Sequence, residues 1–153
     1  MEILMTEFFV ERWTGPHTKK DLDAINFLNK EELKQTREMT WGQFITFLKN
    51  PHIIFVVARR TDTEEIIGKQ TMYMVLLDDG EIKTYLEQVA THPAYKRMGI
   101  GKEILGVLKQ IAHDKGAEFC DFSSNVEKEA AQKFYNSIPG CERRKTNNFR
   151  IRL

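Results

Sequence analysis

A basic turn with two glycines leads directly into an amphipathic helix in the stretch Tyr95–Leu105. Glycines such as Gly99 and Gly101 let the backbone approach a ligand where a Cβ would collide with it. The N–H groups in the first turn of a helix lack intrahelical partners, and the helix dipole adds positive potential, so this position attracts an anion. The pattern predicts a phosphate-binding loop made of Lys96, Arg97, Met98, Gly99, Ile100, Gly101 and Lys102.

The spacing excludes two common phosphate motifs. A Walker A loop needs a glycine five residues before Gly-Lys and a Ser or Thr after it, but Lys96 and Glu103 occupy those positions. A dinucleotide fingerprint needs a third glycine where this chain has Ile104, and an acidic ribose ligand in a following βαβ unit, which is missing. What remains is basic-x-x-Gly-x-Gly opening a helix, preceded by the strand-like run Thr84–Thr91 and the breaker His92-Pro93.

This order resembles the coenzyme A pyrophosphate loop of the GCN5-related N-acetyltransferases, the GNAT superfamily. The family usually has Gln or Arg where this chain has Lys96, and the adjacent Arg97 can supply that role. The resemblance implies acetyl-CoA as cosubstrate, with the backbone N–H groups of residues 97–102 facing its pyrophosphate. Lys96, Arg97 and Lys102 would add positive charge. The alternative is that the two glycines mark an irregular helix start on a solvated basic surface.

The strand before the loop carries the candidate base. The resemblance implies a bulge there, with the backbone of Val89, Ala90 and Thr91 pairing with the pantetheine arm and one N–H pointing at the thioester oxygen. Glu87 is notable because central strands seldom hold an unpaired carboxylate. Its context resembles the Ile-Glu-Asp-Val pattern of small-amine GNAT enzymes, which implies a base that often acts through water. Alternatively, Glu87 pairs with an internal Lys, Arg or Tyr, or only orients the substrate.

Two residues further along complete the predicted site. The segment Ala130–Asn136 resembles the Ala-x-x-Phe-Tyr helix of the family, which implies that the Tyr135 hydroxyl donates toward the cofactor sulfur. The spacing of an aromatic pair alone favours packing, and this remains the expectation for Phe134. The resemblance also implies that Asn125 hydrogen-bonds the pantetheine amides, although an N-cap for the following helix is an equal alternative.

Composition bounds the other functions. A length of 153 residues predicts a single domain over residues 1–153, which the resemblance implies is an N-acetyltransferase domain. The net charge of +1 predicts that it binds neither nucleic acid nor other polyanions. Cys120 and Cys141 form no metal or CxxC pattern, so we expect free buried thiols and a cytoplasmic location. No run is long and apolar enough for a signal peptide or membrane span, and the four scattered histidines predict no metal site. A homodimer stays open.

The elements alternate along the chain. Strands are expected over residues 2–12, 53–59, 66–77 with a bulge at Gly68, 84–91 and 118–122, and a terminal hairpin over 141–145 and 149–153. Helices are expected over 21–28, over 31–48 in one or more pieces, and over 127–137. The helix after the loop carries a core-facing stripe and ends near Gly116; the stripe is Ile104, Leu105, Leu108, Ile111 and Ala112. The order predicts an α/β fold, β-α-α-β-β-β-α-β-α-β-β, with a mostly antiparallel sheet flanked by helices, which resembles GNAT topology.

The acceptor is the least defined part of the prediction. The resemblance implies that it enters opposite the cofactor, where five residues either line its pocket or belong to the core: Met39, Trp41, Phe44, Tyr73 and Tyr85. A small primary amine is the first choice, and a protein lysine or N-terminus is the second. A domain that binds acyl-CoA as a sensor would need neither Glu87 nor Tyr135, so the presence of both favours an enzyme.

Overall fold

The structure, a computed structural model, describes residues 7–153, which form two compact units. One unit ends at Phe122 and the other comprises Ser123–Leu153. The first unit contains, in order, β1 (Phe8–Arg12), α1 (Lys19–Glu31), α2 (Trp41–Lys49), β2 (Ile53–Arg60), β3 (Ile66–Leu76), β4 (Ile82–Leu86), β5 (Ala90–Thr91), the 3₁₀ turn η1 (Pro93–Tyr95), α3 (Ile100–Asp114) and β6 (Asp121–Phe122).

The strands of the first unit form one mixed sheet in the order β1-β2-β3-β4-β6, and β5 also pairs with β3. All neighbours are antiparallel except β4 and β6, which are parallel. The mostly antiparallel sheet predicted from the sequence is therefore confirmed. The first strand is described from Phe8 onward, and the part of that prediction over residues 2–6 lies outside the described residues.

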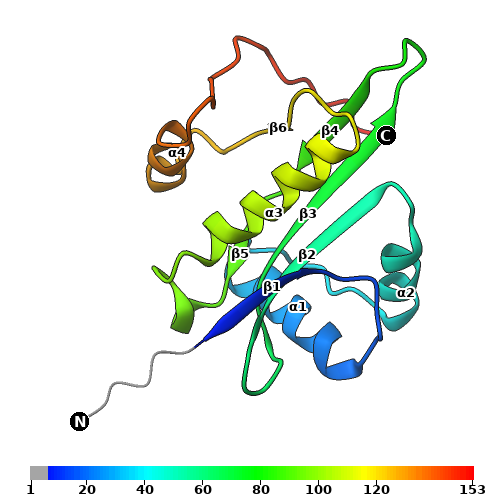
Figure 1. Ribbon diagram of the computed structural model, residues 1–153, viewed down its shortest axis with the longest axis vertical. Helices are drawn as coiled ribbons and strands as arrows, with labels where there is room; N and C mark the ends of the chain where they lie inside the picture. The colour runs from blue at the N-terminus through cyan, green and yellow to red at the C-terminus, as the bar shows by residue number, and fades with distance from the viewer. Residues whose placement is uncertain (1–6) are drawn as a thin grey trace. The chain divides into compact units, whose positions relative to one another are not determined.

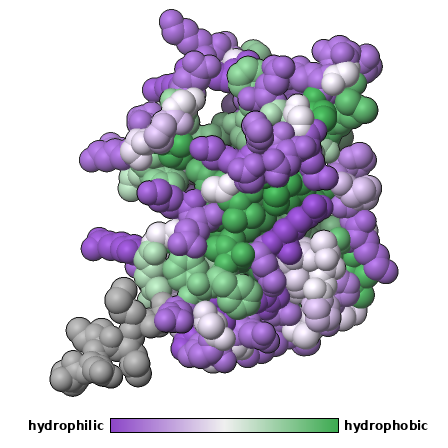
Figure 2. Space-filling model, viewed as in Figure 1, coloured by the Kyte–Doolittle hydropathy of each residue, from purple (hydrophilic) through white to green (hydrophobic). Residues whose placement is uncertain are grey.

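Helices cover both faces of this sheet, and each face has its own core (Figure 1). On one face, α3 packs Ile104 and Leu108 against residues of β2 and β3 such as Val56 and Met72. On the other, α1 and α2 pack against Val57 and its neighbours through apolar side chains, which are Leu22, Ile25, Leu28, Phe44 and Leu48. The predicted stripe of α3 is confirmed, with Leu105 and Ile111 only half-buried at its border. Hydrophobic residues are visible along α3 in Figure 2.

The predicted irregularity at Gly68 occurs one residue earlier and serves the packing of α3. Ala58 pairs with Gly68 and Arg59 with Ile66, so Ile67 is the extra residue of a β-bulge. A Cβ added to Gly68 would lie 2.7 Å from Cγ2 of Ile100, the first residue of α3. Gly68 therefore permits the start of α3, where the predicted phosphate loop ends, to lie directly against the sheet.

The helical prediction over 31–48 is wrong for residues 32–40, which connect α1 to α2 without a helix. The amide of Asn26 binds both the N–H and the C=O of Met39, so local side-chain bonds replace helical ones. Lys34 adopts a left-handed φ of 55°, which interrupts a helix. Thr40 then begins α2 with a capping box that it forms with Gln43.

The second unit contains α4 (Glu129–Asn136), within the helix predicted over 127–137. The predicted terminal hairpin is wrong, because residues 141–153 contain no strand. Its apolar side chains have no face to cover: Phe149 is 91% exposed and Ile151 is 85% exposed. Period-two alternation makes a stable strand only where one face is buried, and none of residues 123–153 belongs to the buried class.

Candidate functional site

The predicted phosphate loop combines left-handed backbone with an uncapped helix start. Arg97 has a φ of 66° and Gly99 a φ of 82°, and α3 follows at Ile100. No side chain among the described residues caps the N-terminus of α3, so the first-turn N–H groups have no side-chain acceptor. Arg97 and Lys102 are both exposed beside this turn. Left-handed backbone beside an uncapped helix start is a geometry that anion-binding loops share, and the anion site itself stays a prediction.

The loop is attached to the end of α1 by two contacts that the sequence did not indicate. The Lys96 ammonium lies 2.7 Å from the Glu32 carboxylate, which is only 16% exposed, just past the end of α1. The Phe27 ring stacks on His92 with centroids 5.1 Å apart. The charge predicted at Lys96 for a pyrophosphate is thus already paired, whereas Arg97 and Lys102 form no ion pair with another described residue.

The strand before the loop is interrupted where the resemblance implied a bulge. β4 ends at Leu86 and β5 begins at Ala90. Toward β3 the chain stays attached, because Glu87 N–H donates to the Thr71 carbonyl at 2.9 Å and the Gln70 side chain donates to the Glu87 carbonyl at 2.9 Å. β4 pairs with β6 only as far as Leu86, and within the described residues no strand pairs with the other edge of β5. That edge can accept an extended ligand as a strand would.

The strand break and the helix start lie against each other. A Cβ added to Gly101 would meet the Val89 methyl groups at 3.7 and 3.9 Å, which is ordinary contact distance. The first turn of α3 therefore sits beside the residue that precedes β5. The two predicted cofactor segments, 96–102 and 89–91, come together in the first unit.

Glu87 shares a sheet face with a buried lysine. Val57 and Phe55 face the α1 and α2 core and pair with Lys69 and Thr71 of β3, so the side chains of Lys69 and Thr71 belong to that face. Because Glu87 bonds to Thr71, its side chain belongs to the same face. The Glu87 side chain is exposed, so the protein alone does not desolvate it.

Lys69 has an unusual environment for a lysine. Its exposed fraction is 7%, and no hydrogen bond or ion pair within 4.0 Å joins its ammonium to another described residue. Burial lowers the pKa of Lys69 to about 8, and the charge of Glu87 opposes this shift without cancelling it. The same carboxylate raises the pKa of Tyr73, although burial contributes more to that shift. Glu87 therefore influences Lys69 and Tyr73 electrostatically but forms no hydrogen bond or ion pair with either. The alternative of a carboxylate paired with an internal Lys or Tyr thus does not take the form of a direct contact.

The sequence reasoning missed Lys69. A signal was present, because Gly68-Lys69-Gln70-Thr71 places polar residues in the middle of a strand that is otherwise apolar on both faces. A charged residue at such a position requires an explanation.

Tyr135 and Asn125 lie in the second unit. Burial raises the pKa of the Tyr135 hydroxyl, with a further contribution from Cys141, so Tyr135 keeps its proton near neutrality, as an acid must. Asn125 Oδ1 accepts from the Glu127 N–H at 3.0 Å, and its carbonyl accepts from the Gln132 side chain. Asn125 thus shapes the turn that leads into α4, although α4 itself has Lys128 as its N-cap.

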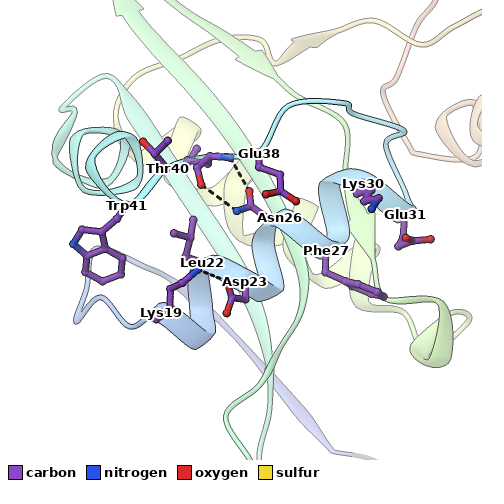
Figure 3. A pocket seen from close by; sticks show the side chains of 11 residues that line it. Lys19, Leu22, Asp23, Asn26, Phe27, Lys30, Glu31, Glu38, Thr40 and Trp41 are labelled. Carbon is purple, nitrogen blue, oxygen red and sulfur yellow. Dashed lines mark hydrogen bonds and ion pairs between the residues drawn. The ribbon is translucent and has the colours of Figure 1, made fainter.

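A groove of about 380 Å³ lies on the outer side of α1 (Figure 3). It is lined by Lys19, Leu22, Asp23, Asn26, Phe27, Lys30, Glu31, Glu38, Met39, Thr40 and Trp41. Only two of the five residues predicted for the acceptor pocket, Met39 and Trp41, contribute to it. Phe44 is fully buried between the Trp13 and Trp41 rings and is core. Of the five predicted residues, Met39 and Trp41 therefore line this groove, whereas Phe44 belongs to the core.

The described residues 7–153 contain no group of three or more His, Cys, Asp or Glu side chains placed to hold a metal ion. Over the same range, no helix has the length and apolar character needed to cross a membrane.

The sequence matches the model of the acetyltransferase (GNAT) family over residues 5–138. Because this covers most of the chain, the protein belongs to that family. No curated protein matches the sequence.

Solved structures share the fold at low sequence identity. An aminoglycoside acetyltransferase from an uncultured soil metagenomic sample, in complex with trehalose, has a TM-score of 0.81 and 19% identity, with 95% of this chain and 96% of that chain covered. The aminoglycoside N-acetyltransferase AAC(6')-Iy in complex with CoA has a TM-score of 0.75 and 14% identity, with both chains covered at 100%. A ribosomal-protein-alanine N-acetyltransferase from Brucella melitensis has a TM-score of 0.74 and 14% identity, with 95% and 99% covered. At these identities the likeness establishes the fold and not the acceptor.

Proposed function

We propose that the protein is an N-acetyltransferase that moves an acetyl group from acetyl-CoA to the primary amine of a small molecule. The observation that carries the proposal is the proximity of Gly101, in the uncapped first turn of α3, to Val89, beside the unpaired edge of β5. The N–H groups of the first turn of α3 suit a pyrophosphate, and the unpaired edge of β5 suits the amide-bearing arm that follows the pyrophosphate in coenzyme A. Family membership supports the same cosubstrate.

Direct attack of the amine on the thioester gives the remaining predicted site residues their roles. The amine nitrogen attacks the thioester carbonyl carbon, while a backbone N–H near Val89 stabilises the oxyanion. The C–N bond forms, the C–S bond breaks, and the electron pair leaves with the sulfur. Glu87 takes the amine proton directly or through water, and Tyr135 gives a proton to the thiolate. Asn125 is proposed to hold the pantetheine amides.

We further propose that residues 1–153 act as one N-acetyltransferase domain in the cytoplasm. The family match runs across the junction at Phe122, which supports one functional domain. Cys120 and Cys141 are free thiols, which suits a reducing compartment.

Release of free thiol from acetyl-CoA across a panel of amines tests the proposal. Amine-dependent release supports an enzyme, whereas binding of acetyl-CoA without release from any amine or peptide would support a sensor. Release with lysine peptides or peptide N-termini alone would favour a protein acceptor.

A matched pair of glycine variants tests the cofactor site. Gly101 and Gly106 both lie in α3 and both have room for a Cβ within the protein. Only Gly101 lies in the proposed pyrophosphate turn. Gly101→Ala should weaken acetyl-CoA binding about tenfold or more, because the new methyl group meets the ligand. Gly106→Ala should bind as wild type does, and equal affinity of the two variants would contradict the assignment.

Tyr135→Phe tests the proposed acid. The change should lower kcat by about 100-fold while acetyl-CoA affinity stays within about twofold. Wild-type turnover by this variant would remove Tyr135 from the mechanism.

A further inference from the structure

Two buried cations stand on the α1 and α2 face of the sheet, and only one of them is neutralised by the protein. Arg59 donates to the Glu11 carboxylate at 2.8 Å, to Asp21 at 3.0 Å and to the Glu64 carbonyl at 2.9 Å, and its guanidinium lies over the Trp13 ring. Lys69 is equally buried, at 7% exposed against 8% for Arg59, and has no such partner among the described residues. Buried charges are normally paired, so a ligand is the natural counterpart of Lys69.

The Lys69 ammonium is not fully enclosed by the protein. The described side-chain nitrogen and oxygen atoms that are fully enclosed without a partner are His17 Nδ1 and Gln70 Oε1. The Lys69 nitrogen is not among them, so it reaches solvent although the rest of its side chain is buried. An atom at the end of a buried stem, open to water and without a protein partner, is placed to bind an anion.

The position of Lys69 relates that anion to the acceptor. Lys69 pairs with Ala90 of β5, and Glu87 bonds to Thr71, two residues further along β3. Lys69 and Glu87 are therefore diagonal neighbours on one face, close enough for each charge to influence the other, yet without an ion pair within 4.0 Å. A molecule on this face meets a cation and a carboxylate side by side.

We propose, on the basis of the acetyltransferase function above, that Lys69 binds an acid group of the acceptor, which is therefore a small aminocarboxylate whose amine lies at Glu87. A zwitterion of this kind complements both charges, whereas a polycation gains one attraction and one repulsion. Lys69 is thus a specificity residue, and polycationic amines such as aminoglycosides are poor acceptors for this chain.

Matched trios of acceptors test the inference by thiol release. The three members of a trio share the same side chain. They are an amino acid, its primary amide and the amine that lacks the acid group, such as leucine, leucinamide and isoamylamine. Values of kcat/KM are corrected for the fraction of each amine that is unprotonated. Wild type should favour the acid over the amide about tenfold or more, which is the strength expected of one charge-assisted hydrogen bond.

Two lysine variants identify the residue responsible. Lys69→Met keeps the length of the side chain and removes its charge, and it should abolish the preference through KM, so that the variant uses the acid and the amide about equally. Lys83→Met, at an exposed position of β4, is the control and should keep the full preference.

The outcomes separate this inference from the proposed function. Equal use of acid and amide by wild type, or an equal loss for all acceptors in Lys69→Met, would overturn the role of Lys69 while acetyl transfer stands. Release from polycationic amines but from no member of any trio would also overturn the role of Lys69 alone. Binding of acetyl-CoA with no release from any amine of the wider panel would overturn the proposed function and this inference with it.

Discussion

Arg59 and Lys69 lie ten positions apart on adjacent strands and illustrate two uses of a buried positive charge. The surroundings of Arg59 are complete, because two carboxylates, a carbonyl and an aromatic ring satisfy its guanidinium. The surroundings of Lys69 contain one carboxylate at a distance and no direct partner in the described part of the chain. A cation that the protein neutralises stabilises the fold, whereas a cation left without a partner costs stability and must be retained for another reason.

Arg59→Met gives the largest expected effect. The change leaves Asp21, which is 9% exposed, without its partner, and loss of one member of a buried pair destabilises a protein by about 3–5 kcal/mol. Chemical denaturation measures this free energy of unfolding. The milder variant Asp21→Asn should lose less, because it retains a group that can accept from Arg59. Wild-type stability of both variants would show that the pairing of Arg59 with Asp21 does not stabilise the fold.

Lys69→Met should have the opposite sign. The pKa of Lys69 is about 8 in the folded protein and about 10.5 when unfolded, so its charge destabilises the fold by about 3 kcal/mol below pH 8. Between pH 8 and 10.5 the unfolded chain binds more protons than the folded one, so wild-type stability rises with pH through this window. Lys69→Met should be more stable than wild type at pH 7 by up to that amount, and its stability should lack this rise.

Urea unfolding of wild type, Lys69→Met and the control Lys83→Met at pH 7 and pH 10 measures the difference. Lys83→Met should follow wild type at both values. Loss of stability in Lys69→Met at pH 7 would mean that Lys69 has a structural partner after all.

Glu87→Gln links the comparison to catalysis. Removing the proposed base should lower kcat by about 100-fold and flatten the acid limb of the pH–rate profile. Because Glu87 opposes the desolvation of Lys69, the variant should also lower the pKa of Lys69 further. An unchanged profile would leave Glu87 as a residue that only orients the acceptor. An unchanged titration of Lys69 would show that Glu87 does not influence the pKa of Lys69.

The smallest expected effect distinguishes the basic residues of the loop. Lys96 is paired with Glu32, whereas Arg97 is exposed and forms no ion pair with another described residue. Lys96→Met should therefore weaken acetyl-CoA binding only about twofold, and Arg97→Met by several-fold more, with the Arg97 contribution falling as salt is added. Calorimetric titration with acetyl-CoA at two salt concentrations measures both. A larger loss for Lys96→Met would mean that Lys96 leaves Glu32 when the cofactor binds.

The features that the sequence predicted well are local. Gly99 and Gly101 at the start of α3 and the stripe through Ile104 and Leu108 each depend on neighbouring residues. The charge environment depends on distant ones. Lys96 pairs with Glu32, and Lys69 is buried by pairing with Val57 and Ala90, contacts that no spacing rule specifies.

The errors have the same origin. The terminal hairpin expected over 141–145 and 149–153 is absent because strands also need a buried face, and Phe149 and Ile151 are exposed. The helix expected over 31–48 fails at residues 32–40, because the amide of Asn26 bonds to Met39 across thirteen positions and local spacing does not reveal these bonds.

The titration of Lys69 itself tests the central contrast most directly. NMR of the protein with ¹³C-labelled lysine, with Lys69→Met for assignment, follows this one amine in the free protein and with an acceptor bound. The account predicts a pKa near 8 that rises when an aminocarboxylate binds, because an anion favours the charged form, and that does not rise with the matching amide. An ordinary lysine titration in the free protein, or a response that ignores the acid group, would contradict it.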